Sequence, residues 1–385
     1  MTNPRYFVTG ASGQLGQLVV AALANRVGAD AVAAIVRDPA RSASLFPEGV
    51  TIRRGDYDKP ETLQAALAGA KRLLLISSNE VGRRVPQHRN VIEAAKKARV
   101  SRIAYTSVLH ADTSKLGLAE EHRQTEALVE ASGLSYTLLR NGWYTENYAA
   151  SIAPALQHGA FIGSARDGRI ASAARLDYAE AAAIALIGDE GDRVVHELAG
   201  DTSYSLSEFA AEISRQADKT IPYVDLPETD YRAALVGAGL PEPLAALYAD
   251  SDAAAAEGAL FDDSGALSRL IGRLTTPFAA TIAATLETLG VPTDPEKPTI
   301  AASRPEDILP DDTDRTDFGG VTIRKGTIAA FLQNAMRWSD PGTSDAERKL
   351  LEDAIVEAMP ALRAVGLFDV LDARDEQLRA LLANI

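Results

Sequence analysis

A glycine-rich segment near the N-terminus, "FVTGASGQLGQLVV" at residues 7–20, constrains the fold more than any other part of the chain. Gly10, Gly13 and Gly16 are spaced three apart, between a short β-rich run and an apolar helical run. In this arrangement a strand turns sharply into a helix whose first amides face a phosphate. Because glycine motifs also arise by chance, the sequence that surrounds this one must decide whether it has that role.

The first half of the chain supplies this context. Six β-rich apolar runs alternate with helical patterns: "RYFVTG", "AVAAIV", "VTIRRG", "RLLLISS", "RIAYTS" and "SYTLLRN". Their continuous apolar character indicates strands that are covered on both faces. We predict an α/β fold with a doubly wound parallel Rossmann sheet, a smaller α/β portion that covers the substrate, and a helical C-terminal appendage. The loop then presents to a dinucleotide pyrophosphate Gly10, Ala11, Ser12, Gly13, Gln14, Leu15 and Gly16.

Composition excludes several classes of function. The 385 residues have a net charge of -14, which argues against a nucleic-acid partner, since binding phosphate backbones needs clustered cations. The chain has no cysteine, and its five histidines show no metal-ligand spacing, so we expect no metal. No stretch approaches the roughly 18 apolar residues of a membrane span, and we expect a cytoplasmic protein without one.

The residue after the second strand indicates which dinucleotide is bound. Arg37, in "AAIVRDP", lies about twenty residues beyond the loop, where a cation can pair with the 2′-phosphate of NADP and an acidic residue would hold the ribose of NAD. We therefore expect NADPH as the cofactor. The neighbouring Asp38 keeps NADH open, as does the possibility that Arg37 is simply solvated.

Further cofactor contacts are expected at the carboxyl edge of the sheet, where ligands bind in open α/β folds. Ser77, Ser78 and Asn79 follow the fourth strand, and their small polar side chains leave room for the nicotinamide ribose. Asp56 and Tyr57 follow the third strand. Their roles stay open between bordering the adenine and simple turn or packing positions.

The chain contains no Tyr-x-x-x-Lys pair, which supplies the proton in short-chain alcohol dehydrogenases. Two interpretations remain. Either the protein binds the dinucleotide without turnover, or its substrate accepts a hydride without a strong proton donor. Quinones meet the second condition, because the hydroquinone anion that forms is stabilised by delocalisation.

Several segments, in order along the chain, resemble a known family. "VTGASGQLG", "LLLISSNEVGRRVPQHRNVIEAAKKA", "IAYTSVLHADTSKLGLAEEH" and "YTLLRNGWYTENY" are similar to the bacterial NADPH-dependent quinone oxidoreductases of the NmrA-like, atypical short-chain reductase group. The resemblance covers about residues 5–290 and implies direct hydride transfer from NADPH to a quinone. It also implies cofactor contacts at residues 10–16, at the positions named above, and at Asn141, Gly142, Trp143, Tyr144 and, as a further candidate, Arg175.

The same resemblance implies that Asn141, Trp143 and Tyr144 contact the quinone. His110, after the fifth strand, is a weak candidate for a proton donor, and no obligatory catalytic acid is assigned. His88, at the front of a predicted helix, is expected to have no chemical role. A rival hypothesis is a non-catalytic NADP(H)-binding redox sensor, and a reductase of some other enone or aldehyde is a third.

The predicted organisation has four parts: an NADP-binding domain at 1–150, an interleaved substrate portion at 151–290, a linker at 291–320 and a helical appendage at 321–385. The linker is rich in Pro and Asp. Apolar stripes at helical spacing predict the appendage, which would be only marginally stable alone and so favours docking. Its apolar residues can pack within their own bundle, on the reductase or on another subunit, and a homo-oligomer or a protein partner bound through this tail stays open.

Overall fold

The computed structural model forms two compact units, Met1–Thr293 and Asp294–Ile385. It describes residues 4–189, 191–291, 315–318, 321–324, 327–340, 342–364, 367–370 and 376–383. Most of the predicted linker at 291–320 therefore lies outside the described residues. The finer division of the first unit at residue 150 stays a prediction.

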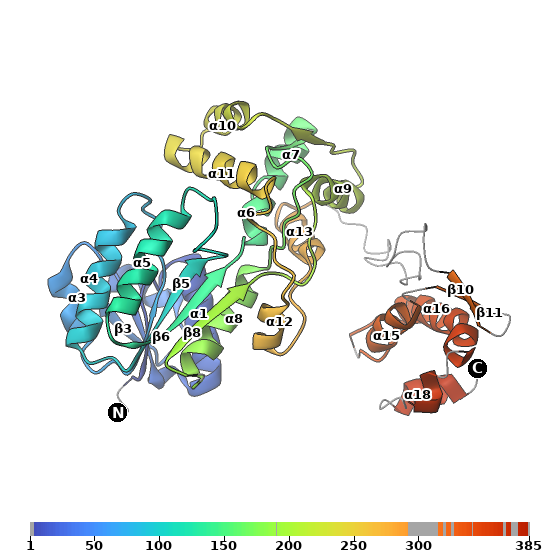
Figure 1. Cartoon of the computed structure of the whole chain (residues 1–385), viewed down its shortest axis with the longest axis horizontal. Helices are drawn as coiled ribbons and strands as arrows, with labels where there is room; N and C mark the ends of the chain where they lie inside the picture. The colour runs from blue at the N-terminus through green and yellow to red at the C-terminus, as the bar shows by residue number, and fades with distance from the viewer. Residues whose placement is uncertain are drawn as a thin grey trace. The chain divides into compact units, whose positions relative to one another are not determined.

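A sheet of seven parallel strands forms the centre of the first unit (Figure 1). Its order is β3-β2-β1-β4-β5-β6-β8, and the strands are β1 (Tyr6–Val8), β2 (Val32–Val36), β3 (Thr51–Arg54), β4 (Arg72–Leu75), β5 (Arg102–Val108), β6 (Ser135–Asn141) and β8 (Arg193–Leu198). The doubly wound Rossmann fold is thus confirmed. β8 is a seventh strand beyond the six that the sequence predicts. Most of its residues are exposed or half-buried, because it lies at the edge of the sheet beside β6.

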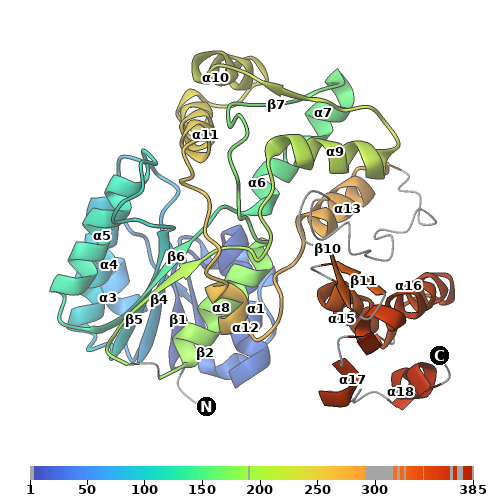
Figure 2. The ribbon, with the colours of Figure 1, turned by 45° about the vertical axis from the view of Figure 1, so that its right-hand side comes forward.

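Helices cover both faces of this sheet (Figure 2). One face packs against α1 (Gln14–Val27), α8 (Arg175–Ile187) and α12 (Ala266–Ile271), and the other against α3 (Pro60–Ala66), α4 (Arg84–Lys97) and α5 (Ala119–Ala131). The short helix α2 (Pro39–Ser42) and two 3₁₀ turns, Ala29–Ala31 and Ala43–Leu45, join the first strands. The order of strands reverses between β1 and β4, and open α/β sheets bind ligands at such a point.

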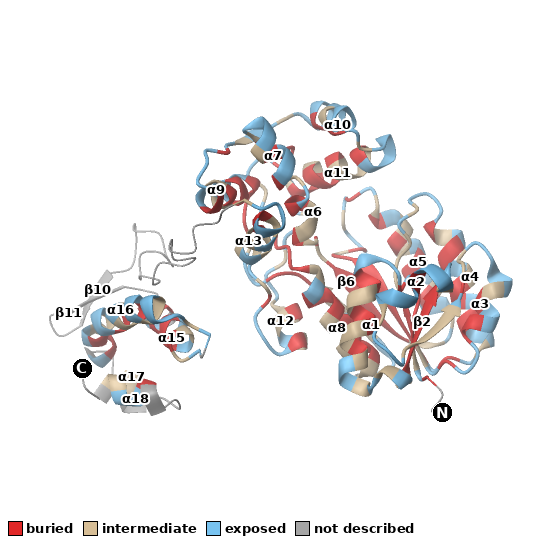
Figure 3. Cartoon of the chain, turned by 180° about the vertical axis from the view of Figure 1, so that it is seen from behind, coloured by how far each residue is buried: buried red, intermediate tan, exposed pale blue. Residues whose placement is uncertain are grey.

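A smaller α/β portion follows β6. Around one apolar core it gathers α6 (Thr145–Ala149), α7 (Ile152–His158), α9 (Leu206–Ala217) and α13 (Phe278–Thr288), with β7 (Phe161–Gly163) parallel to β9 (Tyr223–Asp225). A capping box begins α9, in which Ser205 and Glu208 satisfy each other's backbone amides. α10 (Glu228–Gly237) and α11 (Glu242–Ala255) lie on either side of a Gly-Leu-Pro segment at residues 239–241. Buried residues concentrate where these helices meet and along the large sheet (Figure 3).

The second unit is helical with a small hairpin. Its elements are β10 (Arg315–Phe318), β11 (Val321–Arg324), α15 (Thr327–Trp338), α16 (Asp345–Ala364), α17 (Leu367–Val370) and α18 (Glu376–Ala383). The antiparallel β10–β11 pair has one strand on each side of residue 320, where the sequence predicts that the linker ends, and that boundary stays a prediction. The two strands are separated in the sequence only by Gly-Gly, a pair typical of two-residue hairpin connections.

The apolar residues of α15 divide between core and surface. Phe331 and Trp338 are buried in the core of the second unit with Ile355 of α16, whereas Ile328 and Leu332 are exposed. In the described parts of both units, no helix is long and apolar enough to cross a membrane.

Candidate functional site

A cavity of about 660 Å³ lies along the carboxyl edge of the sheet, where the strand order reverses. This volume is typical of cofactor and substrate sites. The structure brings to it every predicted binding residue except Ala11: Gly10, Ser12, Gly13, Gln14, Leu15, Gly16, Arg37, Ser77, Ser78, Asn79, Asn141, Gly142, Trp143, Tyr144 and Arg175. Ala11 is fully buried behind the loop, where its amide donates to the Ile35 carbonyl.

Each glycine of the first loop serves a different purpose. Gly10 has φ +63°, a conformation that glycine adopts without strain. A Cβ on Gly16 would lie 2.4 Å from the Gly10 oxygen, so the loop backbone and the first turn of α1 meet too closely for any side chain. Gly13 is the N-cap of α1 and has no side chain to accept the first amides. The helix N-terminus therefore presents amide hydrogens and a positive dipole to an anion.

Arg37 and Asp38, at the end of β2, differ in whether their side chains are accessible to a ligand. The Arg37 side chain is 74% exposed, with its guanidinium 3.9 Å from Glu80 Oε1 at the cavity rim. Asp38 is the N-cap of α2, and its Oδ1 accepts the amides of Ala40 and Arg41 at 3.1 and 3.2 Å. The cation is therefore accessible to a 2′-phosphate, while the carboxylate that would hold the NAD ribose is engaged in a cap.

Hydrogen bonds from two helices fix the segment after β4. The Ser78 amide donates to His88 Nε2 at 3.0 Å, and Arg84 Nε donates to the Ser78 carbonyl at 2.7 Å. Because an amide can only donate, His88 carries its hydrogen on Nδ1, which lies 2.9 Å from Thr125 Oγ1. Burial, followed by the charge of Arg84, lowers the pKa of His88 to about 3. His88 therefore positions the cavity wall, a structural contribution that the sequence did not indicate, while the expectation that it has no chemical role stays a prediction.

The other end of the cavity is formed by the turn after β6. The Gly142 amide donates to the Leu198 carbonyl at 2.7 Å, and a Cβ on Gly142 would lie 3.0 Å from that oxygen. The guanidinium carbon of Arg175 lies 4.9 Å from the centre of the Tyr144 ring, a cation–π contact. The Trp143 ring is nearly perpendicular to that of Tyr248 in α11, with centres 6.2 Å apart. These contacts hold the turn against the cavity.

Four buried polar atoms that line the cavity have no hydrogen-bond partner in the described part of the chain: Arg84 Nη1, Gln87 Oε1, Asn141 Oδ1 and Trp143 Nε1. An unpaired buried polar atom costs free energy, and native proteins rarely leave several together. The cavity is therefore built to receive a ligand that offers both donors and acceptors. A dinucleotide meets this need along its ribose and carboxamide groups.

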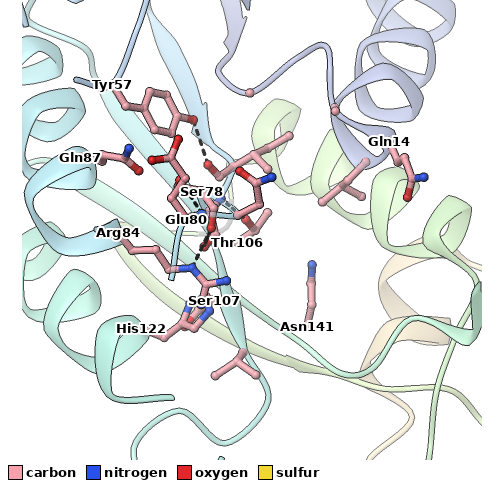
Figure 4. A pocket seen from close by; sticks show the side chains of 18 of the residues that line it. Gln14, Tyr57, Ser78, Glu80, Arg84, Gln87, Thr106, Ser107, His122 and Asn141 are labelled. Atoms are coloured by element: carbon pink, nitrogen blue, oxygen red, sulfur yellow. Dashed lines mark hydrogen bonds between the residues drawn. The ribbon is translucent and has the colours of Figure 1, made fainter. Parts of the chain in front are cut away.

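Two further side chains, from α4 and α5, reach the same cavity and were not among the predicted binding residues. Figure 4 shows Arg84 and His122 on the wall beside Ser107, across from Asn141. His122 Nδ1 is 2.8 Å from the Tyr105 hydroxyl. Their positions depend on how the helices lie on the sheet, so the only sequence signal was a polar residue on the buried face of each helix.

His110 lies elsewhere. It has φ +52°, and its Nε2 is 3.3 Å from the Phe261 carbonyl and 3.6 Å from Asp262 Oδ2. It is not among the residues that line the cavity. Its role as a proton donor stays a prediction without support from this geometry. Among the described residues, no cluster of three or more His, Asp or Glu side chains could hold a metal ion.

The fold and the cavity define an NAD(P)H-binding protein of the Rossmann class, and the family model described as NAD(P)H-binding matches residues 10–183. Quinone oxidoreductase 2 of Escherichia coli is 55% identical over 277 residues, which cover 71% of this chain and 96% of that protein. The chain therefore belongs to the family of NAD(P)H-dependent quinone oxidoreductases in the NmrA-like, atypical short-chain reductase group.

Solved structures agree with this assignment. NADPH-dependent quinone oxidoreductase QOR2 from Escherichia coli, in complex with NADPH, matches with a TM-score of 0.70 and 53% identity, over 72% of this chain and 99% of that one. Triphenylmethane reductase of Citrobacter sp., in complex with NADP(H), matches with a TM-score of 0.69 and 35% identity, over 73% of this chain and its whole length. Each match covers less than three quarters of this chain.

Proposed function

We propose that this protein is an NADPH-dependent quinone oxidoreductase that transfers a hydride directly from the nicotinamide to a quinone. The observation that carries this proposal is one continuous cavity, which joins the phosphate-binding loop and Arg37 to an aromatic wall at Trp143 and Tyr144. The relatives named above support it, since one is a quinone oxidoreductase and its solved counterpart holds NADPH.

The residues present fit the cofactor. The amides at the start of α1 would hold the pyrophosphate, Arg37 the 2′-phosphate, and Ser77 to Asn79 the nicotinamide ribose. Asn141, with its unpaired Oδ1, would accept a hydrogen bond from a polar cofactor group. When bound, NADPH supplies the hydride. The work of the chain is to hold the reacting groups in line and to exclude water.

The cavity wall at the nicotinamide end suits a flat apolar substrate. It is lined by the aliphatic side chains of Val108, Leu118 and Leu247 and by the Trp143 ring. A planar quinone can lie in such a slot, while Tyr144 under Arg175 borders its polar edge. Because delocalisation stabilises the hydroquinone anion, this chemistry is compatible with a chain that has no Tyr-x-x-x-Lys pair.

The first test is NADPH oxidation, followed by its absorbance, with purified full-length protein and a simple benzoquinone, beside NADH and a reaction without quinone. We expect quinone-dependent turnover that favours NADPH. Tight NADPH binding without turnover of several quinones would reject this proposal in favour of the redox sensor. Turnover confined to enones or aldehydes would instead reject the substrate class.

For the second unit we propose the role of an attachment site, either to another copy or to a partner protein. The support is an exposed apolar stripe on α15 of Ile328, Leu332 and Met336, which follow each other at intervals of four residues. Light scattering of the full chain and of a variant with all three changed to Ser tests it. An equal mass for both in solution would exclude self-association through this stripe.

A further inference from the structure

One wall of the cavity carries a histidine that neither the cofactor contacts nor the aromatic slot accounts for. His122, on α5, is only 5% exposed, and its remaining surface lines the cavity. Its Nδ1 is occupied by the hydroxyl of Tyr105, a fully buried residue of β5, at 2.8 Å. No partner for Nε2 lies among the described residues, so this nitrogen is the polar atom that His122 offers to a ligand.

The Tyr105 contact bears on which nitrogen of His122 carries the hydrogen. Either Nδ1 or the Tyr105 hydroxyl can be the donor in this contact, and the hydroxyl also interacts with Ser77 and Thr125. When the phenol donates to Nδ1, the neutral imidazole bears its hydrogen on Nε2. We assign His122 this tautomer, in which it donates a hydrogen bond into the cavity.

His122 is held neutral in this position. Burial, followed by the charges of Arg84 and His88, lowers its pKa well below the ordinary value. Arg84 lines the same wall, with Nη1 buried and without a partner in the described part of the chain. Figure 4 shows the Arg84 guanidinium beside His122. A neutral donor and a cation on one wall of the cavity are an arrangement that stabilises negative charge on a ligand oxygen.

We propose that His122 Nε2 donates a hydrogen bond to the quinone oxygen on which negative charge develops during hydride transfer, with Tyr105 as the residue that positions it. This inference rests on the proposed function. The quinone gains a hydride, one hydrogen with two electrons, and becomes a hydroquinone monoanion, while NADPH is oxidised to NADP⁺. One proton from solvent completes the hydroquinone. His122 stabilises the anion and keeps its own hydrogen.

The kinetic test compares two replacements of His122. His122→Leu removes the donor and is expected to lower kcat for benzoquinone roughly 100-fold, the loss typical when one such donor is removed. His122→Gln, whose amide can reach the place of Nε2, should recover much of that loss. NADPH affinity, measured by titration without quinone, should stay unchanged in both. His158→Leu, at an exposed position of α7, is the matched control with wild-type kcat.

A spectroscopic readout tests the tautomer without turnover. In protein with ¹⁵N-labelled histidine, His122 should show a protonated Nε2 and an unprotonated Nδ1 throughout neutral pH. Tyr105→Phe should relax this preference and lower kcat less than His122→Leu does. Since Tyr105 does not line the cavity, NADPH affinity should be kept. A protonated Nδ1 in the wild type would overturn the inference.

The outcomes separate this inference from the function that it assumes. A wild-type protein without quinone reduction rejects the proposed function itself. Wild-type turnover that His122→Leu leaves unchanged rejects only the role of His122. A loss of NADPH affinity in the folded His122→Leu protein would assign the Nε2 donor to the cofactor and equally overturn the inference.

Discussion

His88 Nε2 accepts the backbone amide of Ser78 at 3.0 Å, and through this bond a helix on one face of the sheet sets the shape of the cavity wall. The bond needs a neutral imidazole. Burial first, and the charge of Arg84 second, lower the pKa of His88 to about 3, whereas an unfolded histidine titrates near 6.5. His88 therefore binds a proton much more weakly in the folded state than in the unfolded chain.

This difference predicts a loss of stability in acid. Since the folded pKa is below the unfolded one, the contribution of His88 is complete above about pH 6.5 and is lost toward pH 3, by about 1.4 kcal/mol per pH unit. His88→Gln keeps an acceptor for Ser78 and removes this component. Urea unfolding at a series of pH values measures it. The same pH dependence in both proteins would show that His88 does not titrate in this way.

Asp252 on α11 should change the free energy of unfolding with pH in the direction opposite to that of His88. It is 1% exposed and accepts hydrogen bonds from the Tyr148 hydroxyl at 2.9 Å and the Ser164 amide at 3.0 Å. Burial is the main cause that raises its pKa to about 6. Because the folded pKa exceeds the unfolded one, its contribution is complete below about pH 4 and is lost as the pH rises through 6, by roughly 3 kcal/mol.

Asp252→Asn has no charge to bury, so its unfolding free energy should lack this decline between pH 4 and 7. Urea unfolding of the variant beside the wild type measures the difference. The variant also loses one of the two acceptors, and this loss should lower its stability by an amount that does not vary with pH. A decline that persists in the variant would assign the effect to another group.

Arg37→Ala should weaken NADPH binding by about 10- to 100-fold and leave NADH binding nearly unchanged, since a charged hydrogen bond to the 2′-phosphate is lost. Fluorescence titration with both nucleotides measures this. Arg41→Ala, one helical turn away and outside the cavity lining, is the control. Asp38→Ala should lower stability by about 1 kcal/mol through the lost cap, without changing the preference for NADPH. Equal losses for both nucleotides in Arg37→Ala would refute the phosphate assignment.

Gly16→Ala should disrupt the first loop. The added Cβ would lie 2.4 Å from the Gly10 oxygen and 2.7 Å from Ala11 Cα, so backbone must move, at a cost of about 1–3 kcal/mol. We expect lower thermal stability and a large loss of nucleotide affinity. Gly237→Ala, on the exposed end of α10 where a Cβ meets nothing within 4 Å, should be neutral or slightly stabilising. Normal NADPH binding by Gly16→Ala would contradict the geometry.

The sequence predicted those features that depend on local order along the chain. The glycine loop, the six central strands and the residues that follow each strand were found because parallel strands bring their carboxyl ends to one edge. The candidate binding residues other than Ala11 line the cavity for this reason. Arg37 led to the prediction of NADPH, but Asp38 kept NADH open as an alternative, because only the structure shows the Asp38 carboxylate engaged in a helix cap.

Features that depend on packing between elements were missed. His88 and His122 face the sheet from helices, and their partners Ser78 and Tyr105 come from neighbouring strands. Spacing within a helix does not specify which strand end it meets. The pairing of β8 with β6 joins residues more than fifty positions apart, which no local pattern records.

The pairing of β6 with a strand that comes much later in the sequence has a consequence for folding during synthesis. Until residues 193–198 have left the ribosome, β6 has an open edge, and an open strand edge invites pairing with other chains. A fragment that ends near residue 150 would keep this edge permanently and should aggregate, although it holds the entire glycine loop. We therefore expect that the nucleotide-binding half does not fold well on its own, and that the edge of β6 is protected only once β8 has paired with it.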